Sequence, residues 1–424
     1  MNTARVHVWA FIVLMLLAGT GRSAVAGIEV ITPAEVKPGD RGVCITEIEG
    51  GRLVEIPVTI LGVVGASQPE GEMVLIRLED PRFEATGVAA GMSGSPVTVD
   101  GRLLGALAFG WQFATEPIAG VTPFTRMQGL GDAGTDIGFE AGSTRPALLE
   151  LAMAHHEGRL VESVLDWLLP GGADEQQALP LVMASGGPAF ATAGRGWTAD
   201  VWQRLGWVTA PGGGAAADVS TGELMPGSMI AGVLVRGDAS LSAGGTVTAV
   251  GDGQVWAFGH PFLGAGDVLM PMARASVVTI LPSLANSFKM FNAGEIIGTL
   301  RSDRRHGVWG TMGPAPEMLP LDIRIGPRSY HFEVLRHRVL TPLLTGVLVI
   351  GSHQTRGRSF GLQSVDLHIE VGLEDGKSLV LDQVFDGVDA PSQAAAWTSA
   401  VVGYLAASPF ASDDIRAVEV KLDS

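Results

Sequence analysis

One strand–turn–strand pattern limits the kind of fold that this chain can adopt. Two apolar runs rich in Val, Leu and Ala, 95–99 and 103–109, flank the dipeptide Asp100-Gly101. Asp-Gly between two such runs is a strong signal for a β-hairpin, because both turn positions favour positive φ. Further short strands are expected at 53–64 and 73–78, so the first part of the chain is predicted to form a β-rich unit.

A second set of short strands is expected far along the chain. Apolar runs recur at 229–235, 245–250 and 255–258, with a turn signal at 251–253. Glycine supplies 58 of the 424 residues, well above the usual share of about 7 per cent. This composition favours a mainly β protein made of short strands and tight turns.

The hydrophobic period changes between the two β units. Apolar residues recur every three or four positions over 146–169, which predicts one long helix or two helices divided at Gly158. Ser143 or Thr144 is a plausible N-cap. The stretch 171–217 shows little periodicity and ends in a glycine and alanine run, so it is interpreted as a connection.

The last region combines strands with a helix. Strands are expected near 321–325, 330–335 and 365–371, and a helix over 392–407. The predicted division of the chain is a signal peptide, a first β-barrel, a helical and Gly-rich connection, a second β-barrel and a C-terminal α+β region. Their predicted ranges are 1–26, 27–142, 143–217, 218–316 and 317–424.

The N-terminus has the pattern of a secretory signal. Arg5 precedes an apolar stretch at 8–19, and Ala24-Val25-Ala26 is typical of a cleavage site. The apolar stretch is shorter than the ~20 residues of a membrane span, so a retained anchor is the less favoured alternative. The protein is expected to be exported to the periplasm or the cell exterior, without a membrane span after cleavage.

Charge and cysteine content exclude several classes of protein. The formal net charge is −16, which argues against nucleic acid and anionic membranes as partners. The single Cys44 cannot form an intramolecular disulfide and is predicted to be buried. No cofactor or metal is expected, because no nucleotide-binding fingerprint occurs in a credible setting and the adjacent His155 and His156 would point apart on a helix.

A candidate catalytic segment, 91–96, precedes the first hairpin and reads Gly-Met-Ser-Gly-Ser-Pro. Glycine permits backbone conformations in which successive amides converge on one point. The amides of Gly91 and Ser93 could therefore stabilise an oxyanion beside the Ser93 hydroxyl. Ser95 is the alternative nucleophile, and a simple tight turn is the alternative interpretation.

His260 is the candidate general base. It lies in the segment 257–262, Ala-Phe-Gly-His-Pro-Phe, in the second β unit. A serine nucleophile needs such a base to accept its proton during attack. The alternative is a histidine at a strand end with no chemical role.

The two β units also resemble each other over a short stretch. Residues 96–113 and 246–262 share a Val-Thr strand, an Asp-Gly turn and an Ala-Phe-Gly ending. This similarity arises either from the general sequence preferences of β-hairpins or from duplication. Duplication would predict two similar barrels.

Residues 91–96 with the following hairpin resemble the serine segment of the SpoIVB-type serine peptidases. Residues 245–260, 292–297 and 307–310 are similar to the histidine segment of that family. The resemblance implies a chymotrypsin-like double β-barrel with the site between the barrels. The serine segment comes first here, whereas it follows the histidine segment in the sporulation peptidase, so the order is permuted.

The resemblance also implies roles for individual residues. Ser93 matches the nucleophile and His260 the general base, while Asp80 lies near the position of the family's orienting acid. Asp267 is the alternative acid, and either aspartate could belong to an ordinary turn. Since catalytic geometry is independent of chain order, the permuted arrangement is compatible with activity.

The sequence therefore predicts an exported serine endopeptidase that cleaves a protein or peptide, with its own chain among the candidate substrates. The alternative is a non-catalytic binding or scaffolding protein that retains the peptidase-like barrels. The oligomeric state is left open.

Overall fold

The computed structural model describes the chain from residue 27 to residue 423, apart from several gaps. The described ranges are 27–65, 71–84, 86–111, 113–131, 146, 148–169, 182–186, 197–206, 208–211, 222–284, 286–355, 361–408 and 415–423. The predicted signal peptide, the predicted helix caps Ser143 and Thr144 and much of the predicted connection lie outside them.

The first β unit is a closed barrel of β1 to β6 in the order β1-β2-β3-β6-β5-β4. The strands are Arg41–Glu49, Arg52–Val64, Met73–Leu78, Pro96–Val99, Arg102–Phe109 and Ile118–Pro123. The predicted hairpin is confirmed, since β4 and β5 pair antiparallel around a turn in which Asp100 and Gly101 have φ of 51° and 76°. Apolar side chains from alternate positions of the strands fill the barrel.

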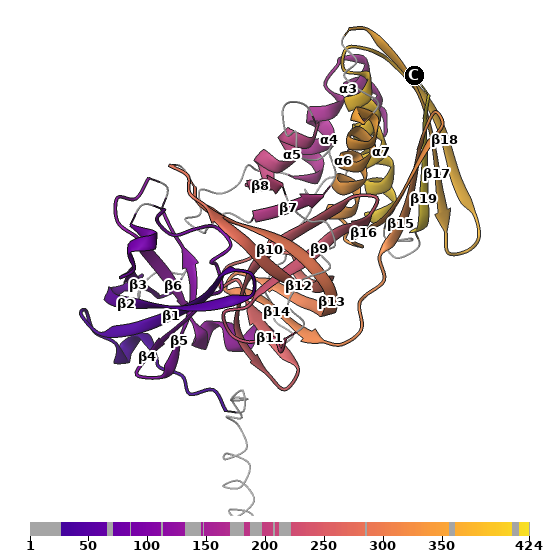
Figure 1. Ribbon diagram of the computed structural model, residues 1–424. Coiled ribbons are helices and arrows are strands. Elements are labelled where there is room, and N and C mark those ends of the chain that lie inside the picture. Colours follow the sequence, from indigo (N-terminus) through magenta and orange to yellow (C-terminus); the bar gives the residue numbers. More distant parts are fainter. Residues whose placement is uncertain are drawn as a thin grey trace, which may run out of the picture.

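The second β unit also closes into a ring of strands. Its members are Met229–Gly237, Ser240–Gly251, Gln254–Ala257, Gly266–Leu281, Phe288–Arg304 and Gly307–Met312, labelled β9 to β14. They follow one another as β9-β12-β13-β14-β11-β10 in a larger sheet, and an additional β9–β10 pairing closes the ring. When the strands are numbered within each barrel, both barrels have the same order, so the structure contains the expected pair of barrels (Figure 1).

The two copies of the short sequence repeat do not lie at equivalent positions in the two barrels. Residues 96–113 include β4 and β5, the fourth and fifth strands of the first barrel, whereas 246–262 includes β10 and β11, the second and third strands of the other. The repeat therefore reflects the shared sequence preferences of two hairpins. The common strand order, and not this repeat, is what relates the barrels.

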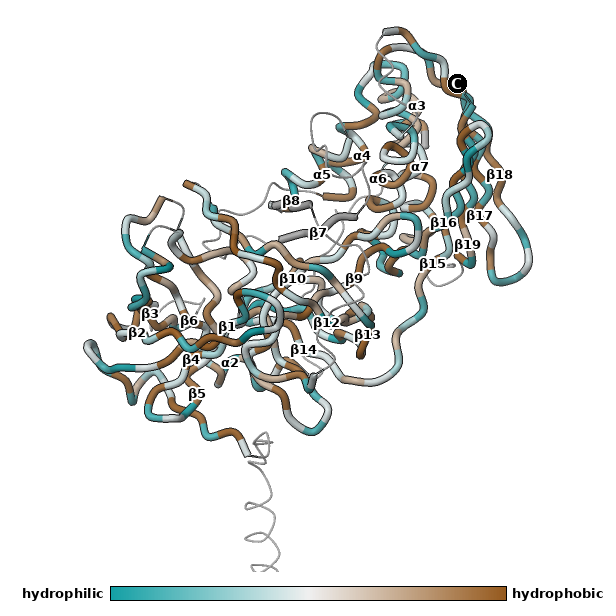
Figure 2. Tube along the Cα trace, viewed as in Figure 1, coloured by the Kyte–Doolittle hydropathy of each residue, from teal (hydrophilic) through white to brown (hydrophobic). Residues whose placement is uncertain are grey.

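The sheet continues from the second barrel into the C-terminal region. Strand β9 pairs with β16, and beyond it come β15, β19, β17 and β18. These strands are Leu319–Ile325 (β15), Arg328–Val334 (β16), Gln363–Leu373 (β17), Ser378–Gly387 (β18) and Ile415–Asp423 (β19). Hydrophilic and hydrophobic residues alternate along this part of the sheet, as expected when one face is buried (Figure 2).

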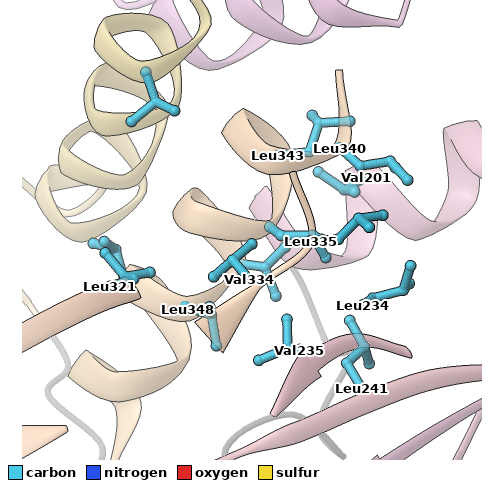
Figure 3. Close-up of a cluster of buried hydrophobic side chains, with 14 of the residues drawn as sticks. Val201, Leu234, Val235, Leu241, Leu321, Val334, Leu335, Leu340, Leu343 and Leu348 are labelled. Atoms are coloured by element: carbon cyan, nitrogen blue, oxygen red, sulfur yellow. The ribbon is translucent and has the colours of Figure 1, made fainter. Parts of the chain in front are cut away.

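Helices cover the buried face of the C-terminal strands (Figure 1). They are α3 (Leu148–His156), α4 (Leu160–Leu168), α5 (Trp197–Leu205), α6 (Leu340–Gln354) and α7 (Ala390–Ala406), and two short strands, β7 (Val182–Gly186) and β8 (Val208–Pro211), lie near them. Of the two alternatives for the first helical stretch, the structure has two helices, divided at Gly158, which has a φ of 71°. Leu343 and Leu348 of α6 belong to the same buried cluster as Val235 of β9, so the layer is fixed to the second barrel (Figure 3).

Short helical turns complete the structure. They are η1 (Pro33–Glu35), η2 (Pro81–Phe83), α2 (Phe124–Met127) and η3 (Gln128–Gly131). Within the described residues, no helix is both long enough and apolar enough to span a bilayer.

Candidate active site

The serine segment forms a tight loop that enters β4 and packs against the second barrel. Gly91 and Gly94 have φ of 88° and 97°, which a residue with a Cβ rarely adopts. The Gly94 amide donates to the Leu107 carbonyl over 2.7 Å, which fixes the loop to β5. Ser93 is almost fully buried within it.

Strand β10 of the second barrel binds the carbonyl groups of this loop. The amide of Thr246 donates to the Ser93 carbonyl at 2.7 Å, and its hydroxyl donates to the Gly91 carbonyl at 2.9 Å. The Thr248 hydroxyl donates to the Gly94 carbonyl at 2.8 Å. The backbone of the loop is therefore held by side chains and amides from the other barrel.

Ser95 has a structural environment. Its buried hydroxyl donates to the Met92 carbonyl at 2.6 Å and lies 2.8 Å from the Thr46 hydroxyl. Ser93 differs, because its buried hydroxyl has no hydrogen-bond partner in the described part of the chain. Of the two candidate nucleophiles, only Ser93 has a hydroxyl without a hydrogen-bond partner among the described residues.

Two backbone amides of the loop are also free. The amides of Met92, Gly94 and Ser95 donate to the carbonyls of residues 89, 107 and 92. Across the described residues, no acceptor receives a hydrogen bond from the amide of Gly91 or of Ser93. These are the two amides that an oxyanion site requires.

His260 lies just beyond β11, after a turn in which Phe258 and Gly259 have φ of 68° and 71°. Its Nδ1 is 2.8 Å from the Pro261 carbonyl oxygen. Since a carbonyl can only accept, Nδ1 carries the proton and Nε2 presents a lone pair. Nε2 is buried and has no partner among the described residues, and burial lowers the pKa of His260 to about 4.

The turn that carries His260 packs closely against the first barrel. A Cβ on Gly94 would lie 1.8 Å from the Thr246 carbonyl oxygen and 2.6 Å from the Phe258 nitrogen. A Cβ on Gly259 would lie 2.7 Å from the Ala106 Cβ. Glycines thus allow the two barrels to meet at the loops that carry Ser93 and His260, although no hydrogen bond joins these two side chains in the described structure.

Neither predicted acid contacts His260. Asp80 begins η2 and accepts a hydrogen bond from Arg82 Nε at 2.9 Å, and this contact lowers the pKa of Asp80. Asp267 is exposed and pairs with Arg304 at 2.7 Å. In this structure the Pro261 carbonyl, and not an aspartate, orients the imidazole.

Asp303 is a buried acid that the sequence reasoning missed. Its carboxylate accepts the amides of Phe262, Leu263 and Ala265 at 2.6, 2.7 and 3.2 Å. Burial raises the pKa of Asp303. The arginine-rich sequence around Asp303, at 301–306, is typical of a solvated turn. No local sequence signal therefore indicated that Asp303 accepts hydrogen bonds from the residues that follow His260.

Within the ranges that the structure describes, no three His, Cys, Asp or Glu side chains gather in a way that could bind a metal ion.

Comparison with known proteins bears on the serine-bearing barrel. Residues 20–124 match the sequence model of the SpoIVB peptidase S55 family. The SpoIVB peptidase match includes all six strands of the first barrel and Ser93, and it ends before the second barrel and His260. The resemblance drawn from the serine segment is confirmed, and the match supports a peptidase. Searches among curated proteins and among solved structures found no match.

Proposed function

We propose that this protein is an exported serine endopeptidase with Ser93 as nucleophile and His260 as general base. The observation that carries this proposal is the pattern of hydrogen bonds around the serine loop. Each carbonyl from residue 89 to 94 accepts a hydrogen bond, whereas the amides of Gly91 and Ser93 donate none in the described structure. Acyl transfer needs a free hydroxyl as nucleophile and free amides that stabilise an oxyanion, and the Ser93 hydroxyl and these two amides match both needs.

The reaction follows from these free groups. His260 Nε2 accepts the proton of the Ser93 hydroxyl while Oγ attacks the carbonyl carbon of a peptide bond. The carbonyl oxygen becomes an oxyanion, which accepts hydrogen bonds from the amides of Gly91 and Ser93. His260 then gives its proton to the leaving amine, and a water attacks the acyl group, with His260 again as base.

The protonation state of His260 supports its role as a base. Because burial lowers its pKa to about 4, the imidazole is neutral at neutral pH, with Nε2 available to accept a proton. Catalytic hydrogen bonds often form fully only with substrate bound, so we place the Ser93–His260 hydrogen bond in the substrate complex. Since both reactive atoms are buried, a substrate must displace neighbouring chain to reach them.

The signal-like segment at 1–26 supports export, with the mature enzyme acting in the periplasm or outside the cell. Its substrate is a protein or peptide, and no cofactor enters the mechanism.

Labelling of the folded mature protein with a fluorophosphonate probe tests the proposal. The wild type is expected to react, and Ser93→Ala and His260→Ala are expected to abolish the reaction. Ser93→Ala should also reduce peptide hydrolysis by about 10⁶-fold. His331→Ala is the matched control for His260, because His331 is an exposed histidine that pairs with Asp322.

Failure of the folded wild type to react would refute the peptidase function. It would favour the second candidate, a binding or scaffolding protein that retains the barrels. The observation in favour of that candidate is the missing hydrogen bond between Ser93 and His260 in the described structure.

A further inference from the structure

Lys289, at the start of β13, lies beneath the serine loop. Its side chain is completely buried, and a Cβ on Gly91 would lie 3.2 Å from its Cβ. The Lys289 amide donates to the Ala90 carbonyl at 2.9 Å, and the Ala90 amide donates to the Ser287 carbonyl at 2.7 Å. This end of the long β12–β13 hairpin of the second barrel thus lies along the residues that lead into the catalytic loop.

The ammonium group of Lys289 connects to the loop through hydroxyl groups. Nζ lies 2.8 Å from Thr46 Oγ1, which in turn is 2.8 Å from Ser95 Oγ. Ser95 Oγ donates to the Met92 carbonyl at 2.6 Å. A continuous chain of hydrogen bonds therefore runs from Lys289 to the carbonyl of the residue before Ser93.

A second branch starts from the same nitrogen atom. Nζ lies 3.2 Å from Thr246 Oγ1, and this hydroxyl donates to the Gly91 carbonyl. Lys289 is therefore within two or three hydrogen bonds of two neighbouring carbonyls of the loop.

Peptide planarity makes these contacts important for the oxyanion site. In a trans peptide unit, the N–H and the C=O point in opposite directions. The Gly91 amide belongs to the unit whose carbonyl is that of Ala90, and the Ser93 amide to the unit whose carbonyl is that of Met92. Lys289 holds the first carbonyl with its backbone amide. It supports the second through Nζ, Thr46 and Ser95, in addition to the hydrogen bond from the Ser95 amide, so it contributes to the direction of both free amides.

The charge environment shows why the lysine can remain buried. Glu47 of β1 is a buried carboxylate that accepts the amides of Gly51, Val277 and Met229 at 3.0, 2.7 and 3.1 Å. Burial lowers the pKa of Lys289 to about 8, while the charge of Glu47 acts in the opposite direction. Burying an ammonium group is costly, and aliphatic residues of similar size often stabilise such positions better.

We propose that Lys289 is a positioning residue for the oxyanion site of the Ser93 loop. Its ammonium group keeps the Met92 and Gly91 carbonyls turned away from the reacting centre, so that the Ser93 amide faces the oxyanion. This inference rests on the proposed peptidase function and adds a residue from the second barrel to it.

The experiment measures the rate of fluorophosphonate labelling against pH in the wild type and in Lys289→Met. Methionine keeps the length of the side chain and the backbone amide, and Glu47 retains its three amide donors. We expect labelling to be about ten- to a hundred-fold slower in the variant at pH 7, since loss of an oxyanion donor costs about 10² to 10³.

The pH profile separates positioning from packing. Two titratable side chains act on Lys289, both from β1: Glu47, and Cys44, whose pKa burial raises to about 12. The wild-type rate should therefore decline above about pH 8 as Lys289 loses its proton. Lys289→Met should show no such decline, and a decline that persists in the variant would overturn the proposal, as would an unchanged rate at pH 7.

A second pair of variants tests the relay if Lys289→Met fails to fold. Thr46→Val removes the link between Nζ and Ser95, whereas Thr248→Val removes a hydroxyl that bonds the Gly94 carbonyl without contacting Lys289. Slower labelling in Thr46→Val than in Thr248→Val supports the proposal, and equal rates overturn it. An unreactive wild type would instead refute the peptidase function itself.

Discussion

Gly94→Ala tests how closely the two barrels meet at the serine loop. The added methyl group would lie 1.8 Å from the Thr246 carbonyl oxygen, and the residue would keep a φ of 97°. Gly101→Ala is the matched control. Gly101 also has a positive φ, 76°, but has no atom within 4 Å of its Cβ position.

The structure gives the expected size of the difference. Positive φ costs a residue with a Cβ about 1–2 kcal/mol in either variant. Only in Gly94→Ala must the backbone also separate, which breaks the hydrogen bonds from Thr246 to Ser93 and from Phe258 to Thr246. Each buried group that loses its partner costs about 1–3 kcal/mol. The free energy of unfolding should therefore fall by about 3–8 kcal/mol in Gly94→Ala, against about 1–2 kcal/mol in Gly101→Ala.

Urea unfolding followed by tryptophan fluorescence measures this difference, because Trp256 lies in the second barrel. With a slope of about 3 kcal/mol/M, the two lost hydrogen bonds should place the midpoint of Gly94→Ala about 1–2 M below that of Gly101→Ala. Equal midpoints would show that the serine loop can move away from β10 at little cost. The inference that the two barrels are tightly packed at this loop would then be wrong.

Three further predictions follow from the environments of single side chains. Fluorophosphonate labelling should persist as the pH falls from 7 to 5 and be lost near pH 4, because burial lowers the pKa of His260 to about 4 and only the neutral imidazole can act as base. Loss of labelling near pH 6.5 would contradict this buried environment. Asp303→Asn should slow labelling about tenfold or more, since the side-chain amide of asparagine accepts fewer hydrogen bonds from the chain after His260 than a carboxylate does. Asp80→Asn and Asp267→Asn should leave the rate nearly unchanged. An equal loss in all three variants would refute this distinction. Cys44 should resist alkylation at pH 8 until the protein is denatured, because burial raises the pKa of its thiol to about 12; rapid alkylation of the native protein would show that this thiol is accessible.

Local sequence patterns predicted much of the first barrel. The Asp100-Gly101 turn and the apolar runs beside it located β4 and β5 within one residue at either end. The glycine pattern around Ser93 likewise indicated a loop with positive φ. These features depend on residues that are close in the sequence, so the sequence displays them directly.

The sequence did not predict the parts of the site that depend on distant residues. Lys289 and Asp303 lie on β13, where each looks like an ordinary polar residue of a strand or turn. Their roles appear only when β13 is placed beside the serine loop and the residues after His260. The candidate acids Asp80 and Asp267 lie near Ser93 and His260 in the sequence, whereas the contact that orients His260 is the backbone carbonyl of Pro261, which no side-chain pattern can indicate.

The three hydrogen bonds that the Glu47 carboxylate accepts from backbone amides limit how the two barrels can separate. Two of them, from Met229 of β9 and Val277 of β12, join the second barrel to β1 of the first, with the carboxylate buried between the barrels. A hinge motion that parted the barrels would remove this charge from its donors, and uncompensated buried charges are strongly unfavourable. We therefore expect a substrate of the proposed peptidase to reach Ser93 by local displacement of loops and not by separation of the barrels. Mutations should then be able to change substrate entry and barrel stability independently.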